Sequence, residues 1–264
     1  MGLSAFFLPE RLPRQLIYAG DRHAEIVRLQ NGRIVERQRV EGAALAENAD
    51  AAWAGIAAAL RTEDAGIVFN AAPFIYNFFE FDKLPWQKKT LRDLVTWRLQ
   101  KIFPENIDAY DHRFFRLDGK RVLSILVKKT LLEKTERLFA EKRVPLTYIG
   151  NSTVEILSRS LQAKSPPDFF LESDQAGCTL VFQSRRSPIY IRKFKSASVT
   201  DTVDEITKTV NFVRNNYSID PRRYWLIEHR DEGFAATMEE QLAGADFFRL
   251  RTGPGAAPHL PARP

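Results

Sequence analysis

The first seventy residues alternate short apolar runs with turn residues, and this pattern predicts a strand meander followed by a helix and a further strand. The second turn contains Asn31-Gly32, a dipeptide that readily takes the positive φ angles of a tight hairpin. The Ala-rich stretch Asp50–Arg61 has the spacing of an amphipathic helix, and Gly66–Asn70 is predicted as a strand parallel to the first. The three consecutive antiparallel strands are predicted at Gln15–Gly20, His23–Gln30 and Arg33–Val40. Meander, helix and strand in this order form the core of a ribonuclease-H-like fold.

A second pattern, at about residues 73–150, predicts an α/β insert with its own apolar core. Its central helix is predicted at Trp86–Phe103 and ends before Pro104, which has no N–H to donate and clashes with the preceding turn. The face of this helix is apolar at Leu91, Leu94, Val95, Leu99 and Ile102. The other expected elements are the strands Phe74–Asp82, Tyr110–Leu117 and Arg121–Lys128, the helix Thr130–Lys142 and the extended run Val144–Ile149.

After the polar break Ala163–Asp168, the predicted secondary-structure elements repeat the order found in the first half of the chain. A hairpin, a helix, a strand, a helix and a last strand are predicted at Cys178–Gln183 with Pro188–Phe194, Asp201–Tyr217, Arg223–Glu228, Glu232–Leu242 and Asp246–Leu250. Two ribonuclease-H-like subdomains with an α/β insert in the first make an actin-like α/β fold. The expected organisation is an extension at 1–14, a first subdomain at 15–162 with the insert, a second at 163–250, and a flexible tail or linker at 251–264.

Composition indicates a globular protein of a reducing compartment. The chain has 264 residues, a formal net charge of +6 and one cysteine, Cys178, so an intramolecular disulfide is excluded. No window approaches the ~18 consecutive apolar residues that span a bilayer. We therefore expect a cytoplasmic location. The positive charge is compatible with anionic lipid or an acidic partner, whereas no nucleic-acid-binding motif is present.

The insert carries a resemblance to a known family. Phe79-Glu-Phe-Asp-Lys-Leu-Pro85 precedes the helix, and Lys101-Ile-Phe-Pro-Glu-Asn-Ile107 leads into the next strand. Val144-Pro-Leu-Thr-Tyr-Ile-Gly150 completes the pattern. From roughly Gln15 to Leu250 the chain resembles the actin-like type IV pilus assembly protein PilM and the cytoplasmic domain of the type II secretion protein L (GspL).

This resemblance implies a scaffold at the cytoplasmic face of the inner membrane. Its implied partners are a membrane-anchored PilN-like or protein M-like protein, docked through a short N-terminal segment, or the hexameric assembly ATPase; a homodimer is also compatible. In a protein of the secretion type, a transmembrane helix would follow Pro264 in a longer chain. Which system and which partner are involved is left open by the sequence.

The nucleotide site of actin-like ATPases is degenerate in this sequence. Such proteins hold phosphates between two hairpin turns of Asp-x-Gly type, where glycines let backbone N–H groups approach the phosphate oxygens. The first turn offers Gly20 and Asp21, with Ala19 where an acidic residue is expected. The second offers Asp174, Gly177 and Thr179 at a shifted spacing. We expect a pseudo-ATPase without a cofactor; the alternative is a nucleotide-binding ATPase that takes ATP and magnesium.

A partner-binding surface is predicted on the insert. Phe74, Tyr76 and Phe78 recur along one predicted strand, and Phe78 and Phe79 must face opposite sides of it. Burial against the first subdomain and a groove that receives a partner segment explain these aromatic residues equally well. The exposed basic residues of the following helix, Lys88 and Arg92 among them, indicate either a solvated face or contact with an acidic partner or membrane.

Other chemistry is not indicated. The four histidines have no metal-ligand spacing and no cysteine pair beside them, so no metal site is expected. A ribonuclease-H-like enzyme would need acidic residues on the strands Gln15–Gly20 and Gly66–Asn70, and these strands contain none.

Overall fold

The structure is a computed structural model, and it divides into two compact units. The main unit contains residues 1–72 and 144–264, and the insert unit contains residues 73–143. The residues that the structure describes are 13–20, 23–31, 33–41, 50–103, 107–162, 168–173, 177–184, 187–195, 198–228, 238, 240 and 246–251. The predicted extension, linker and tail therefore lie almost wholly outside the described residues, as does the predicted helix Glu232–Leu242.

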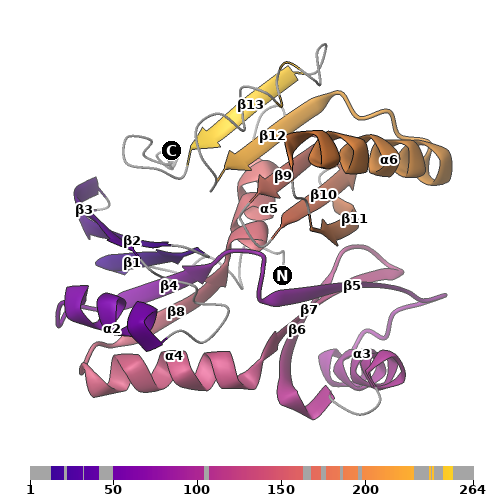
Figure 1. Cartoon of the computed structure of the whole chain (residues 1–264). Helices are drawn as coiled ribbons and strands as arrows, with labels where there is room; N and C mark the ends of the chain where they lie inside the picture. The colour runs from indigo at the N-terminus through magenta and orange to yellow at the C-terminus, as the bar shows by residue number, and fades with distance from the viewer. Residues whose placement is uncertain are drawn as a thin grey trace. The chain divides into compact units, whose positions relative to one another are not determined.

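The first sheet of the main unit has the predicted meander followed by parallel strands (Figure 1). The strand order is β3-β2-β1-β4-β8, with β1, β2 and β3 antiparallel, and with β4 parallel to both β1 and β8. Its elements are β1 (Gln15–Ala19), β2 (His23–Gln30), β3 (Arg33–Glu41), α2 (Asp50–Ala59), β4 (Ala65–Phe69), β8 (Leu146–Asn151) and α5 (Ser152–Gln162). Trp53 of α2 is buried and meets the ring of Phe69 edge-on at 6.4 Å.

The run predicted to close the insert belongs to this first sheet. Residues 146–151 form β8, which pairs with β4, and the insert unit ends at Arg143. The apolar pattern of this run did not reveal which sheet it joins, because backbone pairing decides that. The insert boundary expected at about residue 150 is therefore corrected to 143.

The second sheet of the main unit repeats the first in the order β11-β10-β9-β12-β13. Strands β9, β10 and β11 are antiparallel, and β12 is parallel to β9 and β13. Its elements are β9 (Phe169–Ser173), β10 (Cys178–Ser184), β11 (Ser187–Phe194), α6 (Val199–Tyr217), β12 (Arg223–Glu228) and β13 (Asp246–Arg251). Helix α6 begins after Ser198, whose side chain accepts from the N–H of Asp201, and it packs Ile206 and Val213 onto the sheet (Figure 1).

Strand β9 was absent from the elements expected of the sequence. It lies at the centre of the second sheet and is buried at all five positions. The strand is short, follows two prolines and contains Glu172, and these features obscured the apolar run Phe169-Phe-Leu171. With β9, the second sheet has the same topology as the first.

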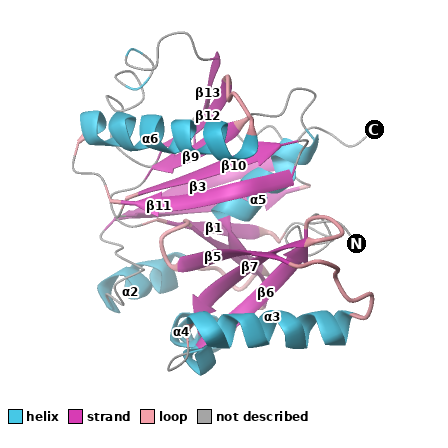
Figure 2. Ribbon diagram, turned by 90° about the vertical axis from the view of Figure 1, so that its right-hand side faces the viewer, coloured by secondary structure: helices cyan, strands magenta, loops and turns pink. Residues whose placement is uncertain are grey.

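The insert unit consists of a three-stranded antiparallel sheet with α3 packed on one face (Figure 2). Its elements are β5 (Phe74–Glu80), α3 (Lys88–Ile102), the 3₁₀ turn η2 (Ile107–Ala109), β6 (Tyr110–Arg116), β7 (Arg121–Lys128) and α4 (Lys129–Glu141), with strand order β5-β7-β6. Leu91, Val95 and Leu99 of α3 are buried as predicted. Ile102, expected on the same face, is 51% exposed, because it is the last residue of the helix.

Candidate functional site

The first predicted phosphate turn, between β1 and β2, is described only at Gly20. The N–H of Gly20 donates to the carbonyl of His23 at 3.1 Å, and a Cβ added to Gly20 would lie 3.1 Å from that same oxygen. Close packing inside the hairpin therefore accounts for this glycine. Asp21, the other residue predicted here, lies outside the described residues.

The second predicted turn leads into β10 and is described from Gly177 onward. Gly177 has a φ of +151°, and an added Cβ would lie 2.4 Å from the carbonyl oxygen of Phe194 on β11. Only glycine tolerates this approach, so the neighbouring strand explains the residue. Thr179 is buried and pairs with Lys193 in the β10–β11 register. Asp174 lies outside the described residues.

A pocket of about 360 Å³ lies beside this second turn, within the main unit. It brings together two of the predicted nucleotide-binding residues and adds two lysines. The lining residues are Ala72, Gly177, Cys178, Thr179, Lys193, Phe194 and Lys195. The volume is at the lower end of the range of small-molecule sites. Lys193, near the end of β11, and Lys195, just after that strand, were missed, although their two-residue spacing in an extended run could have indicated a shared face.

Lys193 and Glu172 hold the short segment that follows β4. The Lys193 Nζ donates to the carbonyls of Ala71 and Ala72 at 3.0 and 2.6 Å. Glu172 of β9, 1% exposed, accepts from the N–H of Ala71 at 3.2 Å. The peptide groups of Ala71 are thus bound by two residues of the second sheet.

Glu172 also reaches the start of α5. The Ser152 hydroxyl donates to it at 2.5 Å and the Thr153 hydroxyl at 3.2 Å. Charge-assisted hydrogen bonds of this kind are about twice as strong as neutral ones. Glu172 therefore joins the second sheet to two segments of the first half of the main unit. It was missed by sequence reasoning because β9 was missed.

The acidic side chains of the described residues bear on the predicted alternative, a site for magnesium and a nucleotide. Magnesium is bound through carboxylates and waters, and no group of three or more His, Cys, Asp or Glu side chains is placed to hold a metal within the described part of the chain. The lining residues that carry charge are lysines, and the carboxylate of Glu172 accepts three hydrogen bonds within the protein. Among its described lining residues, the pocket has two lysines that suit an anion, and none of these residues carries a carboxylate. The assignment of Gly20, Gly177 and Thr179 to nucleotide stays a prediction.

The predicted partner-binding residues of β5 lie on one face of the insert sheet. Phe79 packs against α3 in the unit's core cluster, so Phe74, Tyr76 and Phe78 lie on the face away from α3. Phe74 is buried, whereas Tyr76 and Phe78 are half-buried. Because β5 is an outer strand of its sheet, these rings lie at a sheet edge.

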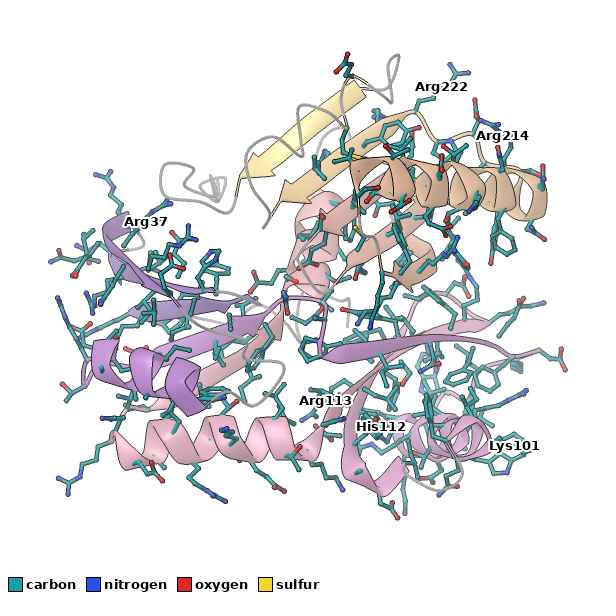
Figure 3. The ribbon with its side chains drawn as sticks, in the orientation of Figure 1. Arg37, Lys101, His112, Arg113, Arg214 and Arg222 are labelled. Atoms are coloured by element: carbon teal, nitrogen blue, oxygen red, sulfur yellow. The ribbon has the colours of Figure 1, made fainter. Side chains whose placement is uncertain are left out.

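The predicted basic residues Lys88 and Arg92 are exposed on α3. Since α3 covers the opposite face of the sheet from Tyr76 and Phe78, the structure separates the two predicted groups. His112 of β6 lies beneath the helix, with its Nε2 3.2 Å from the Thr96 hydroxyl (Figure 3). Burial lowers the pKa of His112, and the charge of Arg92 lowers it further.

Comparison with known proteins identifies the fold. No protein-family model matches the sequence, and no curated protein matches it either. Among solved structures, the PilM–PilN type IV pilus biogenesis complex aligns with a TM-score of 0.67 at 13% identity, covering 91% of this chain and 88% of that one. The cytoplasmic domain of EpsL, an inner membrane component of the Vibrio cholerae type II secretion system, aligns with a TM-score of 0.55 at 7% identity, covering 80% of each chain.

A third matching structure is described as having an actin-like ATPase fold. A Bacteroides thetaiotaomicron protein with an actin-like ATPase fold and unknown function aligns with a TM-score of 0.57 at 8% identity, covering 90% of each chain. The predicted actin-like fold is confirmed, and so is the predicted likeness to the pilus and secretion proteins, at the level of structure. No helix of the described residues is long and apolar enough to cross a bilayer.

Proposed function

We propose that this chain is a non-catalytic scaffold of a type IV pilus or type II secretion assembly platform, located at the cytoplasmic face of the inner membrane. The observation that carries the proposal is the structural match to the PilM–PilN complex over about nine-tenths of both chains. The match to the EpsL cytoplasmic domain supports the same class of machine. A fold match alone leaves function to be argued from the residues.

The polar groups of the second turn support a structural role for this region. Gly177 fits against Phe194, Lys193 binds two backbone carbonyls, and Glu172 accepts hydrogen bonds from two parts of the first half. In an actin-like ATPase the bound nucleotide joins the two halves. Here side chains of the protein join them directly, which suits a scaffold that needs no nucleotide to hold its shape.

The proposed docking site is the outer strand β5 of the insert unit, where Tyr76 and Phe78 are half-buried. A partner segment in extended conformation can pair with an outer strand through backbone hydrogen bonds, while side-chain contacts give specificity. Tyr76 and Phe78, spaced by two, would supply those contacts. Phe74, predicted together with them, is buried. The partner proposed for this edge is the N-terminal segment of a PilN-like protein, or of a protein M-like one in a secretion system.

The test is a titration of the full chain into a fluorescent peptide, followed by anisotropy. The peptide carries the N-terminal segment of the PilN-like protein from the same genome. Phe78→Ala should weaken binding about tenfold, since truncating an interface aromatic residue commonly costs more than 1 kcal/mol. The control is Phe212→Ala, on α6 of the main unit, where the side chain is 44% exposed. Absence of binding, or equal losses in both variants, would contradict the proposal.

One observation favours the alternative of nucleotide binding, namely the two lysines beside Gly177 and Thr179 in the pocket. The scaffold proposal predicts no change in melting temperature with millimolar ATP, whether magnesium or EDTA is present. A ligand at a hundred times its dissociation constant stabilises the native state by about 2.7 kcal/mol, so binding would be visible. A shift that persists in EDTA and disappears in Lys195→Gln would establish an anion site at this pocket and replace the scaffold by a nucleotide-binding protein.

A further inference from the structure

Two tryptophans of the insert unit are exposed. Trp86, two residues before α3, is 93% exposed, and Trp97 on α3 is 46% exposed, whereas Trp53 in the main unit is 4% exposed. Large apolar side chains usually bury most of their area, and tryptophan carries one of the largest transfer free energies. The core of the insert unit does not use these two rings, because the buried side of α3 consists of other residues.

Trp97 belongs to a stripe on the solvent side of α3. Lys89, Asp93, Trp97 and Lys101 recur at intervals of four and therefore share one side of the helix, and all four are exposed. The Lys101 Nζ lies 3.8 Å from the centre of the Trp97 ring, and the Arg98 guanidinium lies 5.5 Å from it. Lys101 extends from the outer side of α3 in Figure 3.

The surrounding segment has a concentrated positive charge. Residues 82–102 contain six Lys or Arg and two Asp, a net charge of +4, compared with +6 for all 264 residues. Arg92 lies on another side of the helix, where its charge acts on His112. The exposed rings are thus surrounded by cations, with Asp93 as the carboxylate of the stripe.

We propose that Trp86, Lys89, Trp97, Arg98 and Lys101, here called the tryptophan–lysine surface, bind the surface of a bilayer that contains anionic lipid. Indole rings prefer the boundary between water and hydrocarbon, because one edge is polar and the body is apolar. Lysine and arginine extend their charges toward lipid phosphates while their aliphatic stems cover apolar area. An acidic protein would satisfy the cations but would not by itself explain Trp86, whose ring is almost entirely exposed beside them.

This inference goes beyond the proposed scaffold function, because lipid contact holds the insert unit at the membrane whether or not a partner segment docks at β5. The two surfaces lie on different faces of the insert unit, with the docking rings on the sheet face away from α3. They can therefore be disabled separately.

The experiment is sedimentation of the full chain with large vesicles of phosphatidylcholine alone, or of phosphatidylcholine with 30% phosphatidylglycerol. We expect binding only to the anionic vesicles, with a decrease between about 50 and 500 mM salt as the surface charge is screened. Each basic residue near an anionic surface contributes about fivefold in partitioning. The double variant Lys89→Gln, Lys101→Gln should therefore lower the partition coefficient about thirtyfold. The control is Arg33→Gln, an exposed cation at the start of β3.

Tryptophan fluorescence tests whether the rings enter the lipid. Brominated phosphatidylglycerol should quench the emission of the wild-type chain, and the quenching should be lost in the double variant Trp86→Ala, Trp97→Ala, whose remaining tryptophans are Trp53 and Trp225. Anionic-vesicle binding that is unaffected by either double variant, or no binding at low salt, would overturn the proposal. Equally strong binding to polyglutamate that does not depend on the tryptophans would indicate an acidic protein instead. Retention of partner-peptide binding in all these variants separates this surface from the docking edge.

Discussion

The two five-stranded sheets of the main unit share a topology but use corresponding positions differently. Their central strands, β1 and β9, each have an antiparallel neighbour on one side and a parallel neighbour on the other. At the first position, β1 has Gln15 and β9 has Phe169. The Gln15 side chain donates to the carbonyls of Arg61 and Glu63 and accepts from the N–H of Arg61, each at 3.0 Å, and these bonds close the α2–β4 loop.

Phe169, the first residue of β9, packs in the core, whereas Gln15, the first residue of β1, makes hydrogen bonds. Phe169 is 1% exposed, with its ring 4.0 Å from Tyr224 and 4.8 Å from Phe182. At the fourth position, β1 has Tyr18 and β9 has Glu172, which bonds to residues of the other half. A repeated topology therefore constrains where strands pair but not which residue joins the two halves. In this protein the second sheet provides that junction.

The largest expected effect is on the aromatic core of the second sheet. Phe169→Ala should lower the free energy of unfolding by about 4 kcal/mol, because it removes a buried ring and leaves a cavity beside Tyr224. The matched change Gln15→Ala should cost about 2 kcal/mol, the amount expected for backbone groups that lose their hydrogen-bond partner. Urea unfolding of both variants measures the difference. Equal losses would show that the two strands contribute to the core in the same way.

A smaller effect is expected at the junction. Glu172→Ala should cost about 3 kcal/mol, since the Ala71 N–H and two hydroxyls lose a buried acceptor. Glu172→Gln keeps the shape and one carbonyl oxygen, so it should cost about 1 kcal/mol, the net contribution of a typical hydrogen bond. Hydrogen exchange should show faster opening at Ala71 and Ser152 in the alanine variant. Slower exchange there, or a larger loss in the glutamine variant, would refute the role of the carboxylate.

The smallest expected effect is a loss of stability at alkaline pH, and it arises from Tyr224, whose ring lies beside Phe169. Burial raises the pKa of the Tyr224 hydroxyl, and the charges of Asp220 and Asp168 raise it further. The unfolded chain therefore loses this proton at a lower pH than the native protein does. Stability should fall as pH rises above about 10 and through the folded pKa, because the native state then binds more protons than the unfolded state. Tyr224→Phe should show a weaker decline in urea midpoint between pH 9 and 11.

Much of the fold could be predicted from the periodicity of apolar residues. The meander, α2, β4, α3 with Leu91, Val95 and Leu99, and α6 all have clear patterns, and each pattern reflects one element burying one face. The nucleotide-binding role of the second turn stays a prediction. Gly177 and Thr179 line a pocket together with Lys193 of β11 and Lys195 just after it, and the pairing of β10 with β11 brings Lys193 beside Thr179.

The spacing of apolar residues was enough to predict most of the elements and the actin-like repeat, because it shows which face of a helix or strand is apolar. Strand pairing assigns residues 146–151 to the first sheet and makes Phe169–Ser173, which was not predicted, the central strand of the second. A glutamate inside a short apolar run predicts an exposed position, since burial of an isolated carboxylate is costly. Glu172 can be buried because Ala71, Ser152 and Thr153, distant in sequence, donate to it. Those partners exist only once the two halves of the main unit have folded together.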